Sequence, residues 1–244
     1  MGDAAQEHRQ WLEQMEAASR AKQASFMDGI ARKLKRPRVT EAPAHPLRGA
    51  PDFWNAFELT PEERIEKFMS NWQSVGGHPA RLADMDAVRK FITDKAKEMG
   101  AHYLIRQNEP ELAALDLEGA LPEAEVSVWN TDADVHWKAR SAEADFGVVM
   151  ADYAAAYTGT VTVLSSKDKG RSVSLLPTVL MIIIPVGRLK TKMGEPLAEL
   201  DRAGRENLPA GAHFISGPSR SSDIENDLTI GVHGPGIVYA LIVG

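Results

Sequence analysis

Cysteine is absent from this chain of 244 residues. Without a thiolate, the protein cannot ligate an iron–sulfur cluster through its own sulfur, form a disulfide or use a thiol as a nucleophile. Any redox centre that the protein works with must therefore come from another molecule, and we expect the chain to carry no cofactor of its own.

Long apolar runs are missing as well. The longest, Val179–Ile184, stops at Pro185 and is far too short to cross a bilayer. The N-terminus, MGDAAQEHRQWLEQ, is polar and acidic where an export signal would have a basic patch followed by an apolar run. We therefore expect no membrane span and a cytoplasmic location.

The chain has no excess of positive charge. Lysine and arginine number 28 against 34 aspartates and glutamates, which gives a net charge of −6. Such a balance provides no bulk attraction to phosphate backbones or anionic membranes. Nucleic acid is therefore not an expected partner.

Two common cofactor patterns are also absent. The seven histidines are scattered, without the HxH or HExxH spacing that would place two imidazoles on one metal ion. No G-x-G-x-x-G sequence opens a strand–helix unit, as a Rossmann-type dinucleotide site requires. We therefore expect neither a catalytic metal nor a bound NAD.

The first fifty residues differ from the rest. Trp11 and Met15, then Phe26, Ile30 and Leu34, recur at helical spacing and predict one or two amphipathic helices. Four prolines between positions 37 and 51, with little apolar periodicity, are typical of a linker. We expect an N-terminal helical extension with a proline-rich linker over residues 1–50, and an α/β domain over residues 51–244.

Helical and strand patterns alternate beyond the linker. Thr60-Pro61-Glu62-Glu63 has the composition of a capped helix start. Val179–Ile184 is apolar without a break, as expected for a central strand buried on both faces, and Ile237–Val243 is the last expected strand. Further strands are expected near residue 81 and at 103–105, 126–129, 146–150, 161–164 and 212–216, and helices at 85–98, after 110, at 135–144 and at 197–205. This alternation predicts a three-layer α/β/α fold with a mainly parallel sheet.

The segment Phe214–Pro235, FISGPSRSSDIENDLTIGVHGP, has the richest chemistry. It predicts a buried strand at Phe214 and Ile215, a Gly217-Pro218 turn, and small hydroxyl residues around Arg220. Ser222 and Glu225 have the spacing of a capping box, which predicts the start of a short helix. Strand, turn and helix start in this order favour an anion site.

The blocks GPSRSSDIE and GVHGP, together with the upstream TGTVTVLSSKDKGRSVSLLP (Thr158–Pro177), resemble the lactate-utilisation protein C family, the LUD domain. The resemblance covers roughly residues 60 to 243 in element order, and its motifs lie within Asp145–Pro185 and Phe214–Val243. It implies a fold similar to the sugar-phosphate isomerase and CoA-transferase superfamily. In such sheets the loops at the carboxyl ends of strands build the site.

Thr158, Gly159 and Thr160 place a glycine between two hydroxyls just before a strand. Such a loop is either a tight turn or a source of backbone N–H groups for an oxyanion, and the resemblance favours the second. Family members usually carry an acidic residue immediately before this tripeptide, where this chain has Tyr157. A tyrosine is neutral at pH 7 and cannot serve as the carboxylate nucleophile of CoA-transferase relatives, which argues for a divergent specificity.

Arg171 is flanked by small residues and matches the family's GRSVSLLP block. We therefore predict that Arg171 and Arg220 bind one small anion in a shared pocket, with the hydroxyls of Ser172, Ser219 and Ser221 as further ligands.

The charge run of Lys167 and Lys169 is typical of a solvated hairpin tip, and a functional role for these two lysines stays open. The basic run Arg32–Arg38 could grip an acidic partner, although a solvated helix end with cations favoured by the helix dipole accounts for it.

Two residues are candidates for proton transfer. His233 lies between glycines that let a ligand approach closely, although a structural hydrogen bond in a turn would explain it equally well. Asp223 could be a general base or a metal ligand, and a carboxylate that favours the helix dipole is the simpler interpretation.

Three hypotheses for function follow. The resemblance implies a protein that serves the oxidation of L-lactate to pyruvate together with iron–sulfur partner proteins, and the residues imply a small anion-binding pocket without a redox centre. The second is a stand-alone enzyme that acts on an acyl, CoA or phosphorylated substrate. The third is a structural or regulatory subunit with a vestigial pocket.

Overall fold

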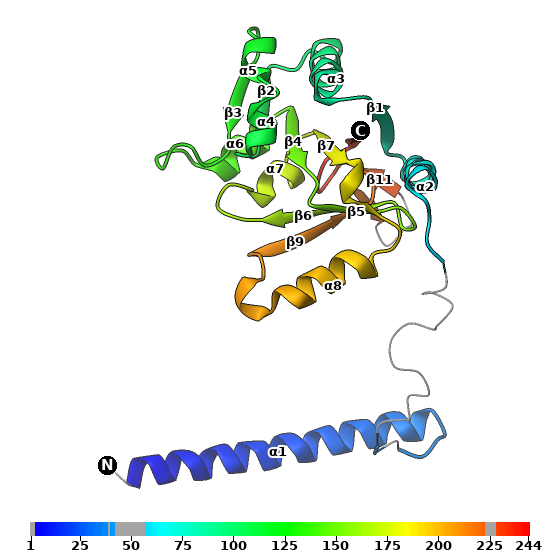
Figure 1. Ribbon diagram of the computed structural model, residues 1–244. Coiled ribbons are helices and arrows are strands. Elements are labelled where there is room, and N and C mark those ends of the chain that lie inside the picture. Colours follow the sequence, from blue (N-terminus) through cyan, green and yellow to red (C-terminus); the bar gives the residue numbers. More distant parts are fainter. Residues whose placement is uncertain (1–2, 39, 42–56, 223–227) are drawn as a thin grey trace. The chain divides into compact units, whose positions relative to one another are not determined.

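The computed structural model describes residues 3–38, 40–41, 57–222 and 228–244. The chain divides into two compact units, Met1–Ala56 and Phe57–Gly244. The described part of the first unit contains one continuous helix, α1 (Asp3–Lys33), where the apolar spacing predicted one or two (Figure 1). Within the described ranges, no helix combines the length and the apolar character needed to cross a bilayer.

A six-stranded sheet forms the centre of the second unit, and every pair of neighbouring strands in it is parallel. The strand order is β1-β12-β7-β4-β2-β3. The bounds are β1 (His78–Leu82), β2 (Tyr103–Arg106), β3 (Glu125–Val128), β4 (Phe146–Met150), β7 (Val179–Pro185) and β12 (Ile237–Val243). The predicted α/β fold with a mainly parallel sheet is therefore confirmed.

Strand β7 is central, as its unbroken apolar sequence predicted. It lies between β4 and β12, and its side chains alternate between two hydrophobic clusters on opposite faces of the sheet. Leu180, Ile182 and Ile184 pack on one face, whereas Met181 and Ile183 pack on the other. This period of two is what a strand buried on both sides requires.

Short and medium helices cover the face that carries Met181. Their buried side chains include Val88 and Ile92 of α3, Leu112 of α4 and Leu117 of α5. The bounds are α3 (Met85–Glu98), α4 (Pro110–Ala113) and α5 (Leu117–Ala120).

The opposite face carries both helices and a second sheet. Helix α2 (Pro61–Ser74) starts at the predicted capping box, in which the Thr60 hydroxyl accepts from the Glu63 N–H and the Glu63 carboxylate accepts from the Thr60 N–H. It buries Phe68 and Trp72 in the same cluster as Leu180 of β7. Helices α6 (Trp137–Glu143) and α7 (Arg171–Leu175) also lie on this face.

The second sheet has four strands in the order β8-β5-β6-β9 and was not predicted as a separate sheet. Its strands are β5 (Tyr153–Ala155), β6 (Thr160–Ser165), β8 (Leu189–Lys190) and β9 (Gly211–Ile215). Ala154, Val161 and Leu189 turn into the core, so this sheet replaces helices as the cover of part of the face (Figure 1). The connection from β8 to β9 contains α8 (Gly194–Ala203) and the short η3 (Arg205–Asn207), and η2 (Val186–Arg188) precedes β8.

The Phe214–Pro235 segment departs from its prediction at two points. Phe214 lies in a strand but is 48% exposed, because it points away from the core. Ser222 ends a strand, β10 (Arg220–Ser222), which pairs antiparallel with β11 (Leu228–Ile230). The predicted helix start at Ser222 is therefore wrong: Ser222 and residues 228–230 are in strands. Pairing between the two strands outweighs the local capping signal. Glu225, its expected capping partner, lies outside the described residues.

Candidate functional site

The parallel sheet has a point at which successive connections leave in opposite directions. The chain leaves β2 through α4 and α5 and reaches β3 on one side, and it leaves β4 through β5, β6 and α7 and reaches β7 on the other. Because β2 and β4 are neighbours, a crevice is expected outside their carboxyl ends, which is where ligands bind in open α/β sheets.

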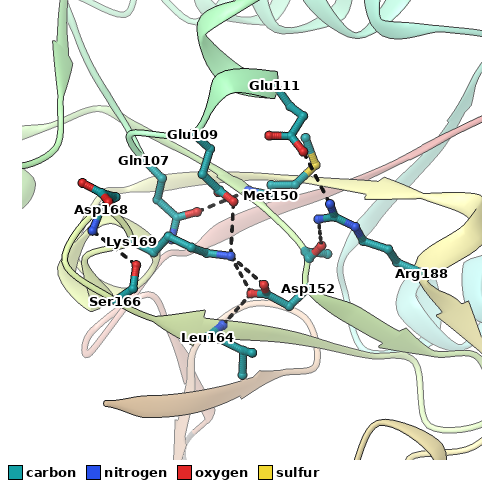
Figure 2. Close-up of polar contacts among 11 residues, drawn as sticks. Gln107, Glu109, Glu111, Met150, Asp152, Leu164, Ser166, Asp168, Lys169 and Arg188 are labelled. Carbon is teal, nitrogen blue, oxygen red and sulfur yellow. Dashed lines mark hydrogen bonds and ion pairs between the residues drawn. The ribbon is translucent and has the colours of Figure 1, made fainter. Parts of the chain in front are cut away.

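Four polar residues occupy this position, and we call them the switch-point cluster: Gln107, Glu109, Asp152 and Lys169 (Figure 2). The Lys169 ammonium donates to both carboxylate oxygens of Asp152 at 2.7 Å. It also lies 3.3 Å from Glu109 Oε1. One lysine thus joins the loop after β6 to the ends of β2 and β4.

The charges within the cluster do not balance, because two carboxylates share one ammonium. The side chains of Lys169, Glu109 and Asp152 are 12%, 15% and 21% exposed. Burial raises the pKa of the Glu109 carboxyl above its ordinary value, an effect that Lys169 opposes in part. Glu109 therefore binds a proton more tightly than a solvent-exposed glutamate does.

The local sequence explains how Lys169 reaches the cluster. Ser166 and Lys169 exchange backbone hydrogen bonds, which closes a tight turn after β6. Asn108 donates its N–H to the Asp168 carbonyl, and this ties the turn to the end of β2. Lys169 therefore faces the sheet, whereas Lys167 is exposed. Of the two lysines interpreted as a possible solvated tip, only Lys167 fits that description.

The two family-like loops of the C-terminal segment meet elsewhere, at the amino ends of β7 and β12. The Ser219 N–H donates to the Pro235 carbonyl at 2.9 Å, and the Gly231 N–H donates to the Ser219 carbonyl at 3.0 Å. Ser219 and His233 line one pocket at this junction, and His233 also lines the adjoining one. These residues therefore lie at the amino ends of the strands. The site was predicted at the opposite edge of the sheet, in the loops at the carboxyl ends.

A third pocket adjoins these two, since all three share Leu175, and we call it the Arg171 pocket. It has a volume of about 510 Å³ and is lined by Trp129, Lys138, Arg171, Ser172, Leu175 and Leu176. Among the described residues, neither cation has a carboxylate partner. The Ser172 hydroxyl accepts from the Ser141 hydroxyl at 3.1 Å. Two uncompensated cations, a hydroxyl and an indole ring are suitable groups for a small anion.

The positive field of Arg171 also reaches His213. Burial lowers the pKa of His213, and the charge of Arg171 lowers it further. The ring Nδ1 is buried without a partner among the described residues, and Nε2 is 3.3 Å from the Ser165 hydroxyl. His213 is therefore neutral near pH 7, and its titration reports the charge in the Arg171 pocket.

Thr158, Gly159 and Thr160 form the turn between β5 and β6, and packing fixes its shape. Gly159 has a φ of +57°, and an added Cβ would lie 2.9 Å from the Asn71 Cβ of α2. The Asn71 amide donates to the Tyr157 carbonyl at 2.9 Å, and Thr160 Oγ1 is 2.8 Å from Ser216 Oγ. These contacts suit the tight-turn interpretation, and a ligand role for the tripeptide stays a prediction.

The remaining candidates lie on or beside the β10–β11 hairpin. Arg220 is exposed on β10 and does not line any of the three pockets described above, whereas Ser221 is half-buried. Asp223 lies outside the described residues. A pocket shared by Arg171 and Arg220 stays a prediction.

The sequence patterns did not single out five residues of these clusters: Gln107, Glu109, Trp129, Lys138 and Asp152. Their position in the sequence could have indicated a site, because Gln107 and Glu109 come shortly after one expected strand and Asp152 comes shortly after another. Within the described residues, no group of three or more histidines, aspartates and glutamates is placed to hold a metal ion.

Comparison with known proteins agrees with this architecture. The family model described as the LUD domain matches residues 65–243. Lactate utilization protein C of Halalkalibacterium halodurans is 33% identical over 213 residues, which are 86% of this chain and 93% of that protein. The proteins of the same name from Shouchella clausii and Bacillus subtilis are 33% and 29% identical, and the matches cover 86% and 87% of this chain and 93% and 92% of those proteins.

A solved structure shows the same fold. The crystal structure of a DUF162 family protein from Deinococcus radiodurans superposes with a TM-score of 0.56 at 18% identity, covering 76% of this chain and 99% of that one.

Proposed function

The chain belongs to the LUD domain family, and on that premise we propose that it takes part in lactate utilisation. The observation that carries the proposal is the similarity to lactate utilization protein C of Halalkalibacterium halodurans, 33% identity across 93% of that protein's length. Nearly the whole length of that relative therefore has a counterpart in this chain.

We propose further that the protein serves the oxidation of L-lactate to pyruvate together with iron–sulfur partner proteins. Oxidation of a hydroxyl to a ketone releases two electrons, which need an acceptor. The chain has no cysteine and therefore no thiolate to hold a cluster. A partner that contains such a cluster would supply the acceptor.

The Arg171 pocket is the proposed site for a small anion. Arg171 and Lys138 supply positive charge, and the Ser172 hydroxyl supplies a hydrogen-bonding group on the same wall. His233, beyond Leu175 in the adjoining pocket, is the candidate for proton transfer. An anion in this pocket would accept charge-assisted hydrogen bonds from the two cations. Such bonds are stronger than hydrogen bonds between neutral groups.

One observation favours a second candidate function. Trp129 lies beside the two cations, and an indole ring offers a stacking surface for a flat ring system. This combination suits a phosphorylated or CoA-type substrate, so the second candidate is a stand-alone enzyme acting on an acyl, CoA or phosphorylated substrate. A purely structural subunit with a vestigial pocket is the outcome if no ligand binds.

A thermal-shift panel of the purified chain tests these alternatives, with L-lactate, pyruvate, inorganic phosphate, nucleotides and CoA esters as probes. A probe at a hundredfold its dissociation constant stabilises the protein by about 2.7 kcal/mol. For the anion that responds, Arg171→Ala should weaken binding by about 1.5 to 3 kcal/mol, whereas Lys167→Ala, an exposed lysine of the preceding turn, should not. Unchanged calorimetric binding to Arg171→Ala would place the anion elsewhere, and turnover by the isolated chain would favour the second candidate.

A further inference from the structure

Helix α1 and the turn after it expose large apolar side chains on one face, which we call the α1 face. Their exposed fractions range from 36% to 68%, and the residues are Trp11, Leu12, Met15, Phe26, Met27, Ile30 and Leu34. At about 100° of helix rotation per residue, all seven lie within about 160° of the helix circumference. A helix gains most of its stability in water by packing such a face against another surface. The α1 face therefore needs a partner.

The α/β domain has a core of its own. Among the described residues, its two hydrophobic clusters consist entirely of residues of the second unit, Phe57–Gly244. The LUD domain model likewise begins only at residue 65. Helix α1 is therefore an addition to the family domain, and its own sequence indicates which partner fits it.

Charge is divided unevenly along α1. Residues 6–18 contain three glutamates and one arginine, so this half is acidic. Residues 20–38, the second half of the helix and the turn that follows it, contain seven lysines and arginines and one aspartate. Two parallel copies would set like charges against each other, whereas two antiparallel copies set the acidic half of each against the basic half of the other. The helix is thus complementary in charge to an antiparallel copy of itself.

The apolar positions have the same symmetry. Met15 and Phe26 are equally distant in sequence from the boundary between residues 20 and 21. Trp11 and Ile30 are also equally distant from that boundary. In an antiparallel pair centred there, Met15 of one copy lies opposite Phe26 of the other, and Trp11 lies opposite Ile30. Both apolar ends of the α1 face are then covered at once, by the register that also matches the charges.

We propose that α1 binds α1 of a second copy of this chain in antiparallel orientation, so that the protein is a dimer joined through its N-terminal units. A second copy supplies apolar cover and opposite charge along the whole helix. An anionic membrane would attract only the basic half and would repel the acidic one, and an acidic protein would likewise match only one half.

Sedimentation equilibrium of the purified full chain tests the dimer. The parent should sediment as a reversible dimer, and Met15→Gln combined with Phe26→Gln should raise its dissociation constant at least about tenfold, because two large apolar side chains leave the interface. Ala17→Gln, which adds the same side chain on the opposite side of the helix, should leave the constant unchanged. A monomeric parent, or equal constants for the parent and the double variant, would overturn the proposal.

Disulfide linking tests the orientation, and the absence of native cysteine gives it no background. Met15→Cys and Phe26→Cys are oxidised separately and as a mixture. Linked dimers should form in the mixture and not in either variant alone, because the two copies of residue 15 lie about 16 Å apart along an antiparallel pair and a disulfide spans a Cα separation of roughly 7 Å at most. Linking within one variant alone would show a parallel pair, and no linking in the mixture would exclude this register. Either result overturns the proposal.

A vesicle-binding measurement separates the dimer from a membrane role of the same face. The full chain should not co-sediment with vesicles of phosphatidylserine and phosphatidylcholine. Binding of the parent to these vesicles, lost in the Met15→Gln and Phe26→Gln double variant, would assign the α1 face to an anionic lipid surface and overturn the proposal. The urea midpoint of the α/β domain should be the same in every variant, because the substituted side chains are exposed on α1.

Discussion

Replacement of Lys169 by methionine tests the interactions that hold the switch-point cluster together. Methionine matches the length of the lysine stem but leaves Asp152 and Glu109 as two buried carboxylates without a cation. Removal of one partner from a buried ion pair costs about 3 to 5 kcal/mol. Because the Leu164 N–H still donates to Asp152 at 2.7 Å and the cluster is partly exposed, we expect about 3 kcal/mol at pH 7.

Urea unfolding followed by tryptophan fluorescence measures this loss. With a slope of about 2 kcal/mol per molar urea, the midpoint should fall by about 1.5 M. Lys167→Met, two residues earlier and exposed, should change the free energy of unfolding by no more than about 0.5 kcal/mol. Adding Asp152→Asn to Lys169→Met should recover part of the loss, since it removes one uncompensated charge. Equal midpoints for Lys169→Met and Lys167→Met would refute the buried ion-pair description.

Three further predictions concern titration and the sheet. Because the folded state holds the proton of Glu109 more tightly than the unfolded chain does, the free energy of unfolding should fall as pH rises from about 4.5 through the raised pKa. Glu109→Gln should lose this dependence in urea titrations at several pH values. Arg171→Ala should raise the pKa of His213 toward its ordinary value of 6.5 in an NMR titration, whereas Lys138→Ala should leave it unchanged; an unaltered His213 in the first variant would contradict the proximity of the two charges. Removal of residues 237–244 should abolish cooperative thermal unfolding, because β12 pairs with both β1 and β7, and a melt near that of the full chain would show that the strand is peripheral.

The order of helices and strands could be predicted because burial leaves a periodic trace in sequence. Val179–Ile184 is apolar throughout, and β7 lies at the centre of the sheet. Thr60 and Glu63 have a capping-box spacing, and both of its hydrogen bonds form. The second sheet was harder to predict, since β5 and β8 are only three and two residues long and their pairing joins residues far apart in sequence.

The polar clusters depended on long-range packing. Lys167 and Lys169 look equivalent in sequence, and only the turn that Ser166 closes separates an exposed lysine from a buried one. Ser222 has the local pattern of a helix cap, yet pairing with the strand around Thr229 decides its conformation. Glu109 and Asp152 could have been noted as residues that directly follow expected strands, but their contact with Lys169 could not.

Growth on L-lactate is the most direct measurement of the central claim, that this protein takes part in lactate utilisation. Deletion of its gene in the source organism should abolish or strongly slow growth with L-lactate as the sole carbon source, while growth on pyruvate stays normal, and a plasmid copy of the intact gene should restore it. Unimpaired growth of the deletion strain on L-lactate, with no second family member in its genome, would contradict the claim.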